Sequence, residues 1–257
     1  MRLTTPVYAL YARRLRRGLR GGVLPRHVGL VMDGDRRRAR RAGPAAPGPG
    51  HRAGAGHVDD VLGWCASLGI RHVTVFVCST ENPARRSEAE AAFLTDLVAQ
   101  VVTGRPARPG GRWRLHVAGD LSVLPDRTAH ALREAVGAGR ARAEHHVTLA
   151  IGHGGRQEIV GALRGLLSEH AESGRSLAEA AAAVGPGDIA RHLGTAGHPD
   201  PGLVTSTSGE QRTSDFPLWQ AAHAELYFCE AHRPAFREVD FLRALRSHAA
   251  RERRRGR

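Results

Sequence analysis

Residues 27–34 have the sequence HVGLVMDG, in which an apolar run ends at an Asp-Gly pair. Short apolar runs rich in β-branched residues are typical of strands that are buried on both faces of a sheet. An Asp-Gly pair favours a tight turn, because both residues tolerate backbone conformations that most residues avoid. The stretch therefore predicts a buried strand over residues 27–32 that opens directly onto Asp33 and Gly34.

The same pattern recurs along the chain and alternates with segments of helical periodicity. Alternation of this kind favours the α/β class, with an open, mostly parallel sheet flanked by helices. In such sheets ligands bind beyond the carboxyl ends of the strands, so the residues that follow each strand are the candidate site. Further strands are expected at 72–78, 113–118, 146–151, 203–205 and 225–228, and helices at about 58–68, 87–102, 127–136, 158–167 and 239–250.

The length of 257 residues suits one large α/β domain, which we expect over residues 24–257. Residues 1–23 are expected to form a basic helix, because Leu10, Tyr11, Leu15 and Leu19 recur at helical spacing beside a run of arginines. This helix could pack on the domain or touch a membrane surface. No apolar stretch there is long enough for a signal peptide or a membrane span. We therefore expect a cytoplasmic protein, with at most peripheral contact at the inner face of the plasma membrane.

The formal charge is +13, and all 38 basic residues are Arg. A chain without Lys and with Asn82 as its single Asn resembles the product of a GC-rich genome, so codon bias explains much of this charge. Arginine also binds diphosphates well, because its planar guanidinium group contacts phosphate oxygens in pairs. The cysteines Cys65, Cys78 and Cys229 form no CxxC pair and no ligand-like spacing with His, so neither a zinc site nor a disulfide framework is expected.

The first strand exit combines a carboxylate, a glycine and a run of basic residues. Asp33 can hold Mg²⁺, and free backbone N–H groups at the start of a following helix can receive phosphate oxygens. The alternative is an ordinary Asp-Gly turn followed by a solvated basic helix face. The residues of this exit are Asp33, Gly34, Asp35, Arg36, Arg37 and Arg38.

The second exit carries Ser79, Thr80, Glu81 and Asn82, which supply two hydroxyls, a carboxylate and an amide after a buried strand. Asn82 could serve a functional site or cap the following helix. A later exit has paired glycines at 154–155 that allow a sharp turn or a close approach to a ligand.

The exit after 203–205 is a hydroxyl-rich loop, 207–214, which contains Gly209 and Arg212 and suits a second phosphate group. Glu225 then places a carboxylate at the start of an apolar strand. The chain has no GxxxxGK[ST] loop, GxGxxG fingerprint, HExxH or GxSxG motif, which argues against the corresponding nucleotide, zinc protease and serine hydrolase chemistries. Nucleic-acid binding is also disfavoured, because few aromatic residues are available for stacking and no groove-reading motif occurs.

Taken in order, these exits resemble the cis-prenyltransferases, also called undecaprenyl diphosphate synthase-like enzymes. Within the family the chain is most similar to actinobacterial short-chain members that form (2Z,6E)-farnesyl diphosphate, notably over 207–212 and 230–236. The resemblance implies a six-stranded, mostly parallel sheet around a hydrophobic tunnel, and a homodimer. The matching segments are 25–28 with 32–34, 51–54, 79–82, 154–156, 207–212, 218–220 and 224–228.

The resemblance also implies roles for individual residues. Asp33 would bind Mg²⁺ and assist departure of the allylic diphosphate, and Glu225 from the partner subunit's side would complete the metal environment. Asn82 would lie near the proton that the condensed intermediate loses. The substrate-binding set would comprise Gly34, Asp35, Arg36, Arg37, Arg38, His51, Ser79, Thr80, Glu81, Arg85, Ser206, Arg212, Thr213 and Ser214. Among these, Gly34, Arg37 and Arg85 would hold the allylic diphosphate, and Arg212 and Ser214 the isopentenyl diphosphate.

The chain departs from the family pattern at several substrate-binding positions. Ser206 stands where the family has Arg before the Thr-Ser-Gly-Glu segment, and Arg38 stands where the family has Trp. The implied activity is Mg-dependent condensation of isopentenyl diphosphate with an allylic diphosphate to give a short Z-configured prenyl diphosphate. The alternatives are a longer-chain polyprenyl diphosphate synthase and a catalytically weakened homologue that acts as a partner subunit.

Overall fold

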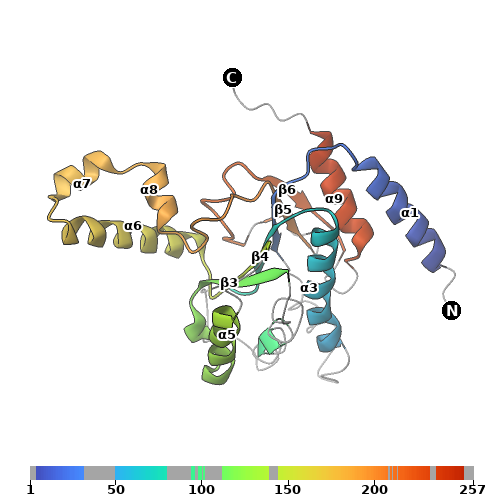
Figure 1. Cartoon of the computed structure of the whole chain (residues 1–257), viewed down its shortest axis with the longest axis horizontal. Helices are drawn as coiled ribbons and strands as arrows, with labels where there is room; N and C mark the ends of the chain where they lie inside the picture. The colour runs from blue at the N-terminus through green and yellow to red at the C-terminus, as the bar shows by residue number, and fades with distance from the viewer. Residues whose placement is uncertain are drawn as a thin grey trace.

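One sheet of six parallel strands organises the chain (Figure 1). The computed structural model describes residues 4–31, 50–79, 94–95, 98–99, 101, 112–138, 144–207, 209, 211–212, 214–231 and 236–251, with side chains omitted at 4–5 and 50–57. The strand order is β3-β4-β2-β1-β5-β6, and every pairing is parallel. The strands are β1 (His27–Val31), β2 (His72–Phe76), β3 (Trp113–Gly119), β4 (His145–Ile151), β5 (Leu203–Ser206) and β6 (Glu225–Phe228).

The helices connect and flank these strands. The predicted α/β class and six-stranded sheet are confirmed. The predicted helices match α5 and α9 closely, whereas α6 is longer at both ends and α3 begins well before the predicted start at residue 58. Most of the predicted helix at 87–102 lies outside the described residues. The sequence patterns did not predict η2, α7 or α8. The helical elements are α1 (Thr4–Gly18), α3 (Gly50–Ser67), η2 (Leu121–Val123), α5 (Asp126–Ala138), α6 (Gly155–Glu172), α7 (Leu177–Ala183), α8 (Pro186–Arg191) and α9 (Glu238–Ala250).

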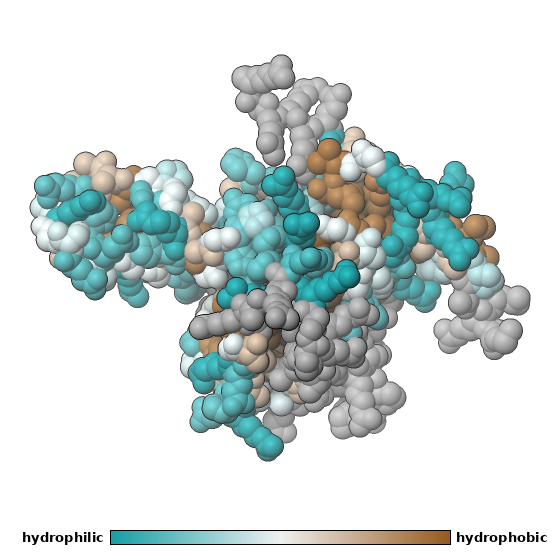
Figure 2. Space-filling model, viewed as in Figure 1, coloured by the Kyte–Doolittle hydropathy of each residue, from teal (hydrophilic) through white to brown (hydrophobic). Residues whose placement is uncertain are grey.

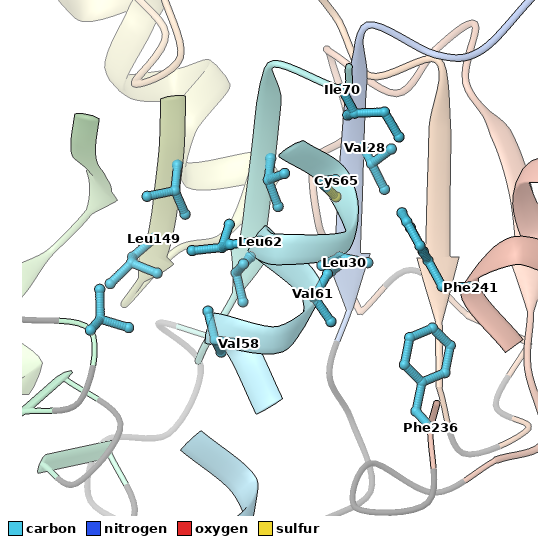
Figure 3. Close-up of a cluster of buried hydrophobic side chains, with 14 of the residues drawn as sticks. Val28, Leu30, Val58, Val61, Leu62, Cys65, Ile70, Leu149, Phe236 and Phe241 are labelled. Carbon is cyan, nitrogen blue, oxygen red and sulfur yellow. The ribbon is translucent and has the colours of Figure 1, made fainter. Parts of the chain in front are cut away.

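The main core lies on one face of the sheet. Alternate residues of a strand point to opposite faces, so Val28 and Leu30 of β1 share this face with Leu149 of β4. Figure 3 shows these side chains meeting those of α3 and Phe241 of α9. Ala129 and Leu132 of α5 join the same cluster. Helices α3, α5 and α9 therefore cover this face and hold the strands in register.

The opposite face has a smaller apolar cluster. Val31, Ala150 and Val204 are the alternating partners of the core residues on their strands, and Phe216 packs on them from the loop after β5. Phe216 is only 1% exposed. Burial of this aromatic ring fixes the loop against the sheet near the carboxyl ends of the strands.

Helix α1 packs along α9 through part of its apolar surface (Figure 1). Leu15 and Leu19 are buried in the main core, and the Arg243 guanidinium of α9 lies 5.3 Å from the ring centre of Tyr11. Leu10 is 70% exposed, and Figure 2 shows brown, hydrophobic surface on the side of the molecule formed by α1 and α9. Packing on the domain thus accounts for one face of α1. The predicted boundary between an N-terminal helix (1–23) and the domain (24–257) stays a prediction.

None of the helices in the described ranges combines the length and low polarity that a membrane span requires.

Gly119 at the end of β3 has a backbone conformation that favours glycine, with φ of +102°. A Cβ atom there would lie 2.3 Å from the backbone oxygen of Ile151, so Gly119→Ala should lower the free energy of unfolding by about 1 to 3 kcal/mol. Gly161 lies in α6 with open space around its Cβ position, so Gly161→Ala should raise stability by about 0.5 to 1 kcal/mol. Urea unfolding of both variants tests the pair; equal midpoints would contradict the close approach at Gly119.

Candidate active site at the carboxyl edge of the sheet

The carboxyl ends of the parallel strands bring part of the predicted site together. Among its predicted residues, Ser79, Ser206, Arg212, Ser214 and Glu225 are described. The backbone of His51 lies in α3, whereas its side chain is outside the described atoms. Asp33, Gly34, Asp35, Arg36, Arg37, Arg38, Thr80, Glu81, Asn82, Arg85 and Thr213 lie outside the described residues, so the roles that the sequence suggests for them stay predictions.

The exits of β2 and β4 lie side by side. Ser79 forms an isolated parallel bridge with His153, and the backbone N–H of His153 donates to the carbonyl of Cys78 at 3.1 Å. The backbone N–H of Gly152 donates to the Cys78 sulfur at 3.2 Å. Pairing thus continues past the ends of both strands, and the half-buried Ser79 is fixed at the carboxyl edge.

Ser206 ends β5 between the last residues of two neighbouring strands. Its register partners are Val31 of β1 and Phe228 of β6. The Ser206 side chain is 3% exposed, and its hydroxyl has no hydrogen-bond partner within the described part of the chain. A buried hydroxyl without a hydrogen-bond partner lowers the stability of the folded chain. Stability therefore does not explain a serine at this position.

The loop after β5 adopts a strained conformation. Ser214 and Asp215 have φ values of 54° and 61°, in the left-handed region that non-glycine residues rarely occupy. The Asp215 carbonyl accepts a hydrogen bond of 2.9 Å from the backbone N–H of Gly155 at the start of α6. A Cβ atom at Gly155 would lie 2.6 Å from the Leu218 side chain. The paired glycines thus allow the loop to pack directly on α6, and such strain tends to occur at functional sites.

A buried polar network joins α6 to the segment that follows this loop. Nε2 of His153 lies 3.2 Å from Oε2 of Glu158, and these side chains are 2% and 10% exposed. Glu158 also accepts hydrogen bonds from the Gln220 amide at 3.1 Å and from the backbone N–H of Gly194 at 3.0 Å. Sequence reasoning did not single out this network, although Gln220 belongs to the 218–220 segment.

The carboxyl of Glu158 is held in its ionised form. Burial alone would raise its pKa, but hydrogen bonds and charge from His153, with hydrogen bonds from Gln220 and Gly194, outweigh burial and lower the pKa below the ordinary value. A carboxyl with a lowered pKa stabilises the fold above its ordinary pKa, and this contribution is lost as the pH falls through the lowered value. The network therefore depends on a charged Glu158.

Glu225 lies at the other edge of the sheet in its own chain. It is in register with Leu203, three residues before Ser206, so roughly 10 Å of strand separates it from the carboxyl edge. Its Oε2 lies 3.6 Å from Nδ1 of His248 and 3.5 Å from Nε of Arg251. Within one chain these contacts direct Glu225 toward α9. A metal shared with Asp33 would therefore need Glu225 from a second chain, which stays a prediction.

Glu158→Gln removes the charge but keeps the shape of the side chain. We expect a loss of about 1 to 3 kcal/mol in unfolding free energy at pH 7, because buried hydrogen bonds to a charged group are lost. The difference from the unaltered chain should shrink below the ordinary carboxyl pKa, where Glu158 is protonated in the unfolded state. Glu134→Gln is the matched control, since Glu134 is 70% exposed and its ion-pair partner, His130 at 3.4 Å, is exposed as well. Urea unfolding at several pH values measures both; a pH-independent deficit would contradict this assignment.

Comparisons with known proteins agree with this architecture. The sequence model of the family described as "Putative undecaprenyl diphosphate synthase" matches residues 31–256. The chain is 58% identical over 258 residues to the isoprenyl transferase of Streptomyces fradiae, with 100% of both chains covered. It is 46% identical over 258 residues to the (2Z,6E)-farnesyl diphosphate synthase of Mycobacterium tuberculosis, covering 100% of this chain and 98% of that one.

A solved structure shares the fold. The lavandulyl diphosphate synthase of Lavandula x intermedia, crystallised with dimethylallyl diphosphate, superposes with a TM-score of 0.75 at 31% identity, covering 90% of this chain and 97% of that chain. The parallel sheet, the loops at its carboxyl edge and the match over residues 31–256 lead to one conclusion. This chain belongs to the prenyltransferase family of undecaprenyl diphosphate synthases, the cis-prenyltransferases.

Proposed function

We propose that this chain condenses isopentenyl diphosphate with an allylic diphosphate and forms a short Z-configured prenyl diphosphate such as (2Z,6E)-farnesyl diphosphate. The observation that carries the proposal is the similarity, at 46% identity over the full chain, to an enzyme named for this product. A relative at this identity that aligns from end to end shares the fold throughout, so equivalent strand exits occupy equivalent positions.

The described geometry supports a site for two diphosphates. The exits of β2 and β4 meet at Ser79 and His153, and the exit of β5 lies beside the end of β1. The strained loop that includes Ser214 and Asp215 borders this edge, with exposed Arg212 next to it. Hydroxyls, backbone N–H groups and a guanidinium at one edge are groups that bind phosphate oxygens.

We assign the chemistry to the residues that the resemblance to the family implies. The allylic C–O bond breaks as diphosphate leaves, a C–C bond forms to the alkene of isopentenyl diphosphate, and the adduct loses a proton. Gly34, Arg37 and Arg85 hold the leaving diphosphate, where arginine charge stabilises the negative charge that develops. Asn82 and Ser79 lie next to the departing proton. Arg212 and Ser214 hold isopentenyl diphosphate.

The acidic residues fit a magnesium ion. Asp33 and Glu225 would hold the ion through carboxylate oxygens, the hard ligands that Mg²⁺ prefers. When bound, the ion neutralises diphosphate charge in the transition state. Because Glu225 faces α9 within its own chain, we assign its contribution to the site of a second subunit, which makes the active form a homodimer.

A cytoplasmic location, with a peripheral membrane contact through α1, completes the proposal.

The direct test is a product assay. Purified protein is incubated with Mg²⁺, labelled isopentenyl diphosphate and either geranyl or farnesyl diphosphate, and products are separated by chain length and double-bond geometry. A single condensation with geranyl diphosphate supports the proposal. Long polyprenyl products would identify a longer-chain synthase, and the absence of product with either primer would favour a partner subunit without activity of its own.

Asp33→Ala should lower kcat by roughly a hundredfold or more, because a group that stabilises developing charge on the leaving diphosphate is removed. Asp60→Ala is the control, since Asp60 is an exposed carboxylate on α3. Steady-state kinetics with saturating Mg²⁺ measure both. An unchanged kcat for Asp33→Ala would remove the basis of the mechanism.

Ser206→Arg should lower the KM for isopentenyl diphosphate by roughly tenfold to a hundredfold, because a charge-assisted contact to a phosphate group contributes about 1.5 to 3 kcal/mol. Ser206→Met adds a long side chain without charge and is the matched control at this buried position. The KM for the allylic substrate serves as an internal reference. Equal KM values for the two variants would show that residue 206 does not contact the diphosphate.

A further inference from the structure

Several histidines gather on the sheet away from the candidate active site. His116 of β3, His146 of β4 and His198 of the α8–β5 connection are half-buried. Each offers one ring nitrogen, and the three nitrogens lie within 4.8 Å of one another. His146 is near the start of β4, so roughly 16 Å of strand separates it from Ile151 at the carboxyl edge.

The sheet register places these side chains on one face. His146 is in register with His72 of β2 and with Arg114 of β3, and His116 follows Arg114 by two residues. Residues two apart on a strand point to the same face. His198 approaches this face edge-on, with ring-centre distances of 4.5 Å to His116 and 5.2 Å to His146.

The spacing of the nitrogens suits a tetrahedral ion. Zinc–nitrogen bonds of roughly 2.0 to 2.1 Å place two ligand nitrogens roughly 3.3 Å apart. Nε2 of His116 lies 3.0 Å from Nδ1 of His146, close to this spacing. His198 needs only a small adjustment to complete a three-nitrogen set, because its nitrogen is already within 4.8 Å of both.

The imidazoles are neutral, as metal ligands must be. Burial first, and then the neighbouring histidines, lower the pKa of His72 and of His116 to about 4. Burial also lowers the pKa of His146 and of His198 below the ordinary value. Nε2 of His116 and Nδ1 of His146 share one hydrogen bond, so the ring that donates it must move this proton to its other nitrogen when a metal binds.

We propose that His116, His146 and His198 form a binding site for a divalent transition-metal cation of the Zn²⁺ class. Three imidazoles without a carboxylate favour Zn²⁺, Co²⁺, Ni²⁺ or Cu²⁺ and disfavour Mg²⁺, which binds oxygen ligands. The site is separate from the diphosphate site, since it lies at the amino half of the strands. An ion there ties the α8–β5 connection to β3 and β4.

His72 acts as a positioning residue for this site. Its ring stacks on His146 at 4.8 Å with an interplanar angle of 6°, and its Nδ1 lies 3.3 Å from Nδ1 of His198. Hydrogen bonds from neighbouring groups orient metal-binding imidazoles in many proteins. Arg114 has the opposite effect, because its positive charge acts on His116, His146 and His198 and repels a cation.

The experiment uses the full chain without a polyhistidine tag, stripped of metal with a chelator. Zn²⁺ is titrated against a chromophoric competitor in the absence of substrate, with Mg²⁺ in a parallel titration. We expect one tight Zn²⁺ site per chain, no Mg²⁺ competition, and a Co²⁺ absorption spectrum typical of nitrogen ligation. The melting temperature should rise with Zn²⁺.

Single substitutions to Gln at His116, His146 and His198 should each weaken Zn²⁺ binding at least roughly tenfold, since losing even an outer-shell partner costs that much. The control is His130→Gln, because His130 is an exposed histidine on α5. Arg114→Gln should bind Zn²⁺ more tightly than the unaltered chain. His198→Gln alters a connection rather than a strand, and its melting temperature without metal verifies that it folds.

Equal Zn²⁺ affinity for the unaltered chain and the three Gln variants would overturn the proposal, as would weaker binding in Arg114→Gln. In that case the cluster is a hydrogen-bonded stack of neutral imidazoles that only joins the α8–β5 connection to the sheet. Because no prenyl substrate enters the experiment, its outcome is independent of the proposed condensation.

Discussion

The parallel pairing of β1 with β2 on one side and β5 on the other is the constraint on which the candidate site depends. Val31 at the end of β1 is in register with Phe76 and with Ser206, so three strand exits open at one edge. β1 is buried along its whole length, and its aliphatic side chains pack into clusters on both faces. A shift of one residue would reverse the direction of each side chain, which burial on both faces opposes.

Strand direction also separates two kinds of chemistry. Hydroxyls, glycines and the strained Ser214–Asp215 pair gather at the carboxyl edge, where parallel sheets bind ligands. Imidazoles gather toward the amino half, where His72 and His146 are paired in register. The strain in the loop is offset by burial of Phe216, which lies one residue beyond it. The loop thus keeps an unfavourable backbone because a large apolar ring fixes the residue that follows.

The sequence predicted the strands well, because buried parallel strands appear as continuous aliphatic runs. It did not predict α7, since LAEAAAA has no apolar periodicity and only Ala180 is buried. The strand exits predicted the position of Ser79, but not the network around Glu158, because Gly194 and Gln220 are far from Glu158 in the sequence. The histidine cluster leaves no local pattern either, because His116, His146 and His198 are far apart in the sequence. The predicted place of Glu225 at the start of a strand is confirmed by its register with Leu203.

The connection between α8 and β5 links both regions. Gly194 donates its backbone N–H to Glu158, and Thr195 accepts a hydrogen bond of 2.8 Å from the Gln220 amide, so this connection is part of the network around Glu158. His198 follows Thr195 closely in the chain, and its ring contacts His116 of β3 and His146 of β4. The α8–β5 connection is therefore held at one end by Glu158 and Gln220 and at the other end by the imidazoles of β3 and β4. One short segment thus contacts both the Glu158 network and the histidine cluster.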